Sequence, residues 1–221
     1  MASANKGTTK DDIIRSLLNT SFSRSAGATS MSDVATFLGI KKASLYNHIS
    51  GRDQLLQEAL DSCAAYIKEL VFIPKDCDEI CKKYSAQTVL KGVTERFFKM
   101  HERNPLFQIY TFVESLKYFN QTAREIIYAE EQSLEQQTMT MLVSLSANNK
   151  LPLTSAQTKA AARWFCNGLR TLLSDWLLER KQIVMDNPAS GEGELFTLPQ
   201  DEKAPLLVEQ FIAEFLSLFS A

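Results

Sequence analysis

Apolar residues recur at spacings of three and four along almost the whole chain, which is the periodicity of one buried face of an α-helix. The recurrence stops at prolines and paired asparagines, and a polar stretch at 186–202 that contains glycine and proline predicts a long loop. Between these breaks the pattern predicts helices at 9–22, 52–71, 76–102 with an interruption near Ser85, 105–118, 121–148, 154–183 and 203–219. No segment has the alternation of a strand, so we expect an all-α fold.

The segment from Ser30 to Ile49 has a different pattern, with two short apolar sets on either side of Gly39. Glycine at that point ends the first helix and supplies a positive φ for a sharp turn. Ser30 followed by Asp33 predicts a capping box at the start of the first helix. The residues expected to share one small core are Val34, Phe37, Leu38, Ile40, Leu45 and Ile49. The pattern indicates a helix-turn-helix, although an ordinary helical hairpin would have similar spacings.

Charge supports the first of these readings. The chain has a net charge of −2, yet residues 1–52 hold seven Lys and Arg against three Asp and Glu, and the rest is acidic. Lys41 and Lys42 lie at the expected start of the second short helix, where cations are unfavourable unless an anion is near. A phosphate backbone would supply that anion. Chance clustering of solvated lysines is the alternative.

The run Val34-Ala35 through Leu38-Gly39-Ile40 and Ser44-Leu45-Tyr46-Asn47-His48-Ile49, followed by Arg52-Asp53-Gln54-Leu55-Leu56, resembles the N-terminal domain of the TetR (tetracycline-repressor) family of bacterial regulators. Lys41 departs from the family pattern, in which a serine or threonine cap is commoner. The resemblance implies a three-helix DNA-binding domain at 1–52 and a helical effector-binding and dimerisation domain at 53–221, with the helix 52–71 connecting them. It further implies a homodimeric repressor that a small-molecule effector releases from a near-palindromic operator.

The resemblance also implies which residues contact double-stranded DNA. The start of the second short helix would enter the major groove, and neighbouring polar residues would contact phosphates. The residues implied are Thr29, Ser30, Ser32, Lys41, Lys42, Ala43, Ser44, Tyr46, Asn47, His48 and Arg52. Tyr46 and His48 have alternative structural roles, as a ring packed on the core and as a hydrogen-bonded spacer.

The last two predicted helices carry apolar residues beyond one core face. In 203–219 such residues cover more than half of the circumference, and in 154–183 alanines and Gly168 would allow another helix to approach closely. Together they favour a four-helix interface between two copies of the chain. The alternative is that both faces are buried within one chain.

Aromatic residues crowd the middle of the chain, and a few polar residues lie among them. A cavity lined by several rings and a few polar groups is the usual form of a small-molecule site. The candidate effector-binding residues are Phe97, His101, Phe107, Tyr110, Glu114, Trp164 and Asn167. A buried Glu114 carboxylate would favour a cationic aromatic effector, whereas a solvent-facing Glu114 is the simpler interpretation.

Other functions have less support. The sequence has no glycine-rich phosphate loop, metal-ligand cluster or evident nucleophile and base, so we expect no enzyme, cofactor or metal site. The spacing of the four cysteines suits small buried hydrophobes better than a metal or redox site. The polar N-terminus and the lack of a long apolar run predict a cytoplasmic protein that does not enter a membrane. An activator, a regulator that responds to a protein partner and a helical ligand carrier without DNA binding remain alternatives.

Overall fold

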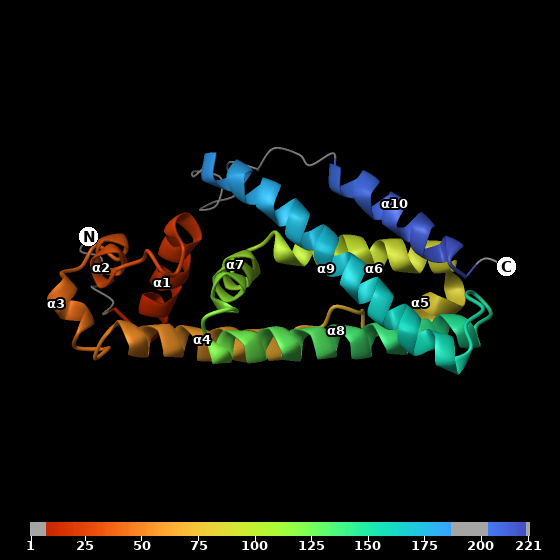
Figure 1. Ribbon diagram of the computed structural model, residues 1–221, viewed down its shortest axis with the longest axis horizontal. Coiled ribbons are helices and arrows are strands. Elements are labelled where there is room, and N and C mark those ends of the chain that lie inside the picture. The colour runs from red at the N-terminus through yellow and green to blue at the C-terminus, as the bar shows by residue number, and fades with distance from the viewer. Residues whose placement is uncertain (1–7, 187–202, 220–221) are drawn as a thin grey trace, which may run out of the picture. The chain divides into compact units, whose positions relative to one another are not determined.

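The computed structural model describes residues 8–186 and 203–219, and every regular element in these ranges is a helix (Figure 1). The all-α prediction is confirmed. The predicted loop at 186–202 lies almost wholly outside the described residues. The helices are α1 (Lys10–Arg24), α2 (Met31–Phe37), α3 (Lys42–Leu45), α4 (Arg52–Lys68), α5 (Cys77–Lys83), α6 (Ala86–His101), α7 (Leu106–Leu116), α8 (Gln121–Ala147), α9 (Ser155–Asp186) and α10 (Lys203–Ser217).

Local sequence signals account for most of these boundaries. Thr9 forms a capping box with Asp12 at the start of α1. The predicted interruption near Ser85 separates α5 from α6, because Tyr84 is extended and the Ser85 hydroxyl accepts a hydrogen bond from the Thr88 backbone N–H at 3.2 Å. A serine at this position replaces one of the partners that a helix start lacks, so the new helix begins there.

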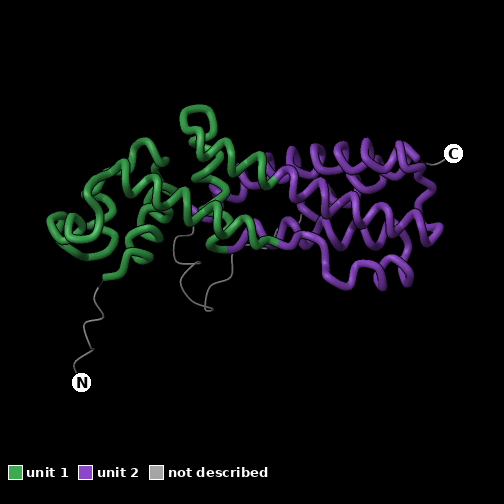
Figure 2. The backbone as a smooth tube through the Cα atoms, turned by 90° about the horizontal axis from the view of Figure 1, so that it is seen from below, with its two compact units in different colours: residues 1–70, 104–130 green, residues 71–103, 131–221 purple. Residues whose placement is uncertain are grey.

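The chain divides into two compact units, each built from two stretches of sequence (Figure 2). Unit 1 comprises Met1–Leu70 and Asn104–Glu130, and unit 2 comprises Val71–Arg103 and Glu131–Ala221. The division by compactness therefore differs from the functional boundary at residue 52 that the sequence predicts. That boundary stays a prediction.

The core of unit 1 joins the first four helices to α7 and the start of α8. Ile13 of α1, Val34 of α2 and Leu60 of α4 are fully buried in it. The rings of Phe22 and Phe107 meet edge to face at 4.9 Å between centroids. Because helices as short as α2 and α3 are unstable alone, this shared core holds them in place.

Unit 2 is a helical bundle in which α10 packs against both α6 and α9. The Gly168 position in α9 lies under the Phe211 ring, where a Cβ atom would come within 2.6 Å of Cε2. The small residue predicted to allow a close helix approach is thus used within one chain. Buried Arg180 forms an ion pair with Glu102, which ties α9 to the residue after α6.

Candidate nucleic-acid interface

The start of α2 is fixed by reciprocal hydrogen bonds between Ser30 and Asp33. The Asp33 backbone N–H donates to the Ser30 hydroxyl at 3.2 Å, and the Ser30 backbone N–H donates to the Asp33 carboxylate at 2.9 Å. The hydrogen bond from the Ser30 hydroxyl, followed by that from its backbone N–H, lowers the pKa of the Asp33 carboxyl. The predicted capping box is confirmed.

The turn between α2 and α3 has the backbone that the sequence predicts. Gly39 has a φ of 67°, and the Ile40 backbone N–H donates to the Ala35 carbonyl at 3.0 Å. After the single turn of α3, Leu45 and Ile49 are buried in the core of unit 1. The turn and these two anchors set the direction of α3.

Phe37 does not belong to that core, so its predicted burial is wrong. Its side chain is 52 % exposed, whereas Val34 and Ala35 are buried. Each residue turns about 100° around a helix, and the buried stripe follows Met31, Val34 and Ala35 into the partly buried Leu38. Phe37 lies about one residue step away from the centre of that stripe.

The residues predicted to read bases lie on the surface around α3. Lys41, Lys42 and Ala43 are exposed, and Ser44 is half-buried. Lys41 precedes α3 without capping it through its side chain. Within the described ranges neither lysine forms an ion pair, so both ammonium groups are available to phosphates or base edges. The predicted contacts Tyr46, Asn47 and His48 are exposed as well.

Two of the predicted phosphate contacts have their hydroxyl groups engaged within the protein. Thr29 is 2 % exposed, and its hydroxyl donates to the Ser25 carbonyl at 2.9 Å. A side-chain phosphate contact by Thr29 therefore needs correction, because its hydroxyl faces the protein interior. The Ser30 hydroxyl completes the capping box, whereas Ser32 is exposed on α2.

Arg52 at the start of α4 has a role that the sequence did not reveal. Its guanidinium donates to the carbonyls of Ala26 at 2.7 Å, Thr29 at 3.2 Å and Gly27 at 3.3 Å. These carbonyls belong to the loop between α1 and α2. Arg52 thus holds the entrance to α2, and only Nη1 lacks a hydrogen-bond partner among the described residues.

Comparison with known proteins supports this reading of the fold. No family model matches the sequence. A crystal structure of a TetR-family regulator from Mesorhizobium loti aligns with a TM-score of 0.58 and 15% identity, covering 96% of each chain. The chain has the fold of the TetR-family regulators.

Two further relatives are regulators by name. IcaR of Staphylococcus aureus, a negative transcriptional regulator of a biofilm operon, is 21% identical over 173 residues, which cover 77% of this chain and 83% of IcaR. FadR of Bacillus subtilis, solved with stearoyl-CoA, aligns with a TM-score of 0.54 and 14% identity, covering 95% of this chain and 98% of FadR. These relatives are transcriptional regulators and not enzymes.

The candidate effector-binding residues are distributed over both units of this TetR fold. In unit 2, Phe97 and His101 of α6 are buried, and Trp164 and Asn167 of α9 are exposed. The His101 Nδ1 atom lies 2.8 Å from the Phe97 carbonyl oxygen. Their role in binding an effector stays a prediction.

The other three candidates belong to unit 1. Phe107 is buried, and Tyr110 and Glu114 of α7 are half-buried. The Glu114 carboxylate accepts a hydrogen bond from the Lys117 ammonium group at 2.5 Å. Because a cation of the protein already neutralises Glu114, this residue no longer favours a cationic effector.

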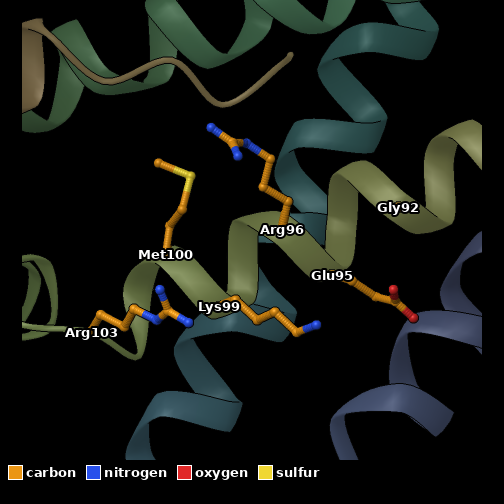
Figure 3. Close-up of a pocket in the computed structure, with 6 residues that line it drawn as sticks. All are labelled: Gly92, Glu95, Arg96, Lys99, Met100 and Arg103. Carbon is orange, nitrogen blue, oxygen red and sulfur yellow. The ribbon is translucent and has the colours of Figure 1, made fainter. Parts of the chain in front are cut away.

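Three grooves are lined by described residues of unit 2, and none of the seven candidate residues lines them. One of 550 Å³ lies between α5 and α8, and one of 360 Å³ lies between α9 and α10. The third, also of 360 Å³, runs along α6 and is lined by three basic side chains (Figure 3). Sequence reasoning missed these cations, although their spacing of three and four residues was the available signal.

The four cysteines are all buried and reduced. Cys77 and Cys81 bring their sulfur atoms within 3.7 Å, and burial raises the pKa of the Cys77 thiol to about 12. Within the described ranges no three metal-ligating side chains come together. No described helix is both long enough and apolar enough to cross a membrane.

Proposed function

We propose that this chain is a TetR-type transcription regulator that binds double-stranded DNA as a homodimer and represses transcription in the cytoplasm. The observation that carries the proposal is the pair Lys41 and Lys42, which are exposed beside the short α3 and have no carboxylate partner among the described residues. The buried Leu45 and Ile49 hold this segment on a rigid core. Charged groups displayed in this way suit the phosphates and base edges of a major groove. The naming of IcaR as a negative regulator supports repression.

Apolar residues on the surface of α9 and α10 support the dimer. Trp164 is 62 % exposed and Leu178 is 71 % exposed, and fourteen residues of helix place them on nearly the same face of α9. Leu206 of α10 is exposed too. Large apolar side chains on one helix face are typical of an interface between subunits. Sedimentation of Leu178→Glu and wild type at micromolar concentration tests this, because only the variant is expected to become monomeric.

A near-palindromic operator follows from the dimer, since two copies of α3 would meet half-sites about 34–36 Å apart. A small molecule that binds a conformation with another spacing of these helices must weaken DNA binding by the same coupling free energy. The stearoyl-CoA in FadR supports small-molecule control for this fold. We keep residues 1–52 as the DNA-binding domain, 53–221 as the effector and dimerisation domain, and α4 as the connection.

The experiment begins by selecting bound duplexes from fragments of the source genome. Binding of the selected duplex is then measured over a salt series for wild type and Lys42→Ala, with Lys68→Ala at the exposed end of α4 as a control of equal charge. The expected result for Lys42→Ala is weaker binding and a salt slope reduced by about 0.9. Equal behaviour of the two variants would contradict the assignment of Lys42. Failure to enrich any duplex would refute DNA binding itself.

A further inference from the structure

A groove of 360 Å³ on unit 2 is formed along one side of α6. Residues spaced three or four apart share a helix face, so one strip of α6 and the residues just after it lines the whole groove. The lining residues are Gly92, Glu95, Arg96, Lys99, Met100 and Arg103. Figure 3 shows Arg96 and Met100 extending from one side of the strip, and Glu95, Lys99 and Arg103 along the other.

The groove has an excess of positive charge that the protein leaves uncompensated. It contains three cations and one carboxylate, and among the described residues none of the three cations forms an ion pair. The three arginines of α9, in the same unit, each pair with a glutamate. Like charges this close repel one another, so an anion in the groove would relieve an unfavourable arrangement.

The positions of the cations suit a compact anion. Lys99 and Arg103 are four residues apart, and Arg96 lies three residues before Lys99, so each is a neighbour on the helix surface. Arg96 uses one of its five N–H donors on the Val71 carbonyl, at 3.3 Å. Arginine forks and a lysine ammonium are the protein groups that best bind phosphate and carboxylate oxygens.

Gly92 is a second feature of the groove that packing does not explain. A Cβ atom there would meet nothing within 4 Å, and the residue has no positive φ. Glycine within a helix is destabilising relative to alanine, so neither contact nor backbone geometry requires it. What Gly92 provides is open space at the surface of the groove.

We propose that this α6 groove binds a compact small molecule with at least two negative charges, either an organic phosphate or a polycarboxylate. Lys99 and Arg103 donate to the anion, Arg96 adds a third cation, and Glu95 opposes the anion at one end. The volume is that of a small-molecule site. Calling the anion an effector rests on the proposed function, whereas its binding does not.

The test uses the full-length protein without DNA, titrated by calorimetry with inorganic pyrophosphate and, separately, with citrate. The double variant Lys99→Gln, Arg103→Gln is compared with a control that removes two exposed lysines elsewhere in unit 2, Lys75→Gln, Lys159→Gln. Saturable binding by wild type and control is expected, with affinity lower by about tenfold or more in the groove variant. The stronger of the two probes identifies phosphate or carboxylate as the preferred group. Helix content measured by circular dichroism confirms that each variant is folded.

Glu95→Gln supplies a test in the opposite direction. Removing the carboxylate is expected to tighten pyrophosphate binding severalfold, which loss of folding cannot imitate. Three results would overturn the proposal: no saturable binding of either probe, equal losses in the two double variants, or unchanged affinity in Glu95→Gln. Since no DNA is present, none of these results bears on whether α3 binds an operator.

Discussion

Arg52→Lys separates two roles for the side chain at the start of α4. The sequence predicts a phosphate contact, which a lysine would largely preserve. The structure shows a guanidinium that donates to three carbonyls of the loop between α1 and α2, a geometry that a single ammonium group does not reproduce. The substitution keeps the charge and removes the fork.

The expected loss of stability follows from the distances. The bond to Ala26 at 2.7 Å is short, and those to Thr29 and Gly27, at 3.2 and 3.3 Å, are longer. Hydrogen bonds of charged groups contribute about 1.5–3 kcal/mol each when sheltered, and Arg52 is exposed, so we take the low end for the set. Arg52→Lys should therefore lower the free energy of unfolding by about 1–2 kcal/mol. For a chain of this length that is a fall of about 2–8 °C in Tm.

The assay is thermal and urea unfolding followed by circular dichroism, with Arg15→Lys on the exposed side of α1 as the matched control. The control should stay within about 0.5 kcal/mol of wild type. The salt slope of DNA binding should be the same for Arg52→Lys and wild type, because the charge is retained. A variant at position 52 as stable as the control would refute the anchoring role that we derive from the three carbonyl contacts.

Three further predictions rest on single contacts. Gly92→Ala should raise the free energy of unfolding by about 0.5–1 kcal/mol, while Gly168→Ala should lower it because the new methyl would meet the Phe211 ring; chemical unfolding distinguishes the two, and a destabilised Gly92→Ala would be the contrary result. Asp33→Asn should lower Tm at neutral pH, where the carboxylate caps α2; because folding lowers the pKa of Asp33, the stability it adds is lost as pH falls through that lowered pKa. The Tm difference should therefore vanish in strong acid, and a difference that persists there would argue against the cap. Cys77, whose thiol pKa is about 12, and the other buried cysteines should react with a disulfide reagent at pH 8 only after unfolding; rapid labelling of the native protein would contradict their burial.

Local features of this protein were predictable because they depend on neighbouring residues. The capping boxes at Thr9 and Ser30, the turn at Gly39 and the break at Ser85 all occur where the sequence predicts them. Each satisfies backbone groups, or permits a backbone angle, within about four residues. The periodicity of apolar residues likewise determined that the described elements would be helices.

Roles that depend on long-range contacts could not be obtained in this way. The composition of α2 does not say that its buried stripe leaves Phe37 outside. The Arg52 guanidinium reaches carbonyls more than twenty residues earlier, and the Thr29 hydroxyl turns inward. An arginine or threonine near a predicted DNA-binding helix looks the same in the sequence whether it contacts DNA or the protein itself.

The sequence by itself thus determined an all-helical chain and the position of a helix-turn-helix with exposed Lys41 and Lys42. Only the tertiary structure decided which polar groups near that motif are engaged within the protein, which aromatic side chains are buried, and that three cations on α6 share a groove without a carboxylate partner among the described residues. The physical reason is range. Hydrogen bonds and dihedral preferences act between near neighbours, whereas burial and charge pairing are settled by residues that only folding brings together.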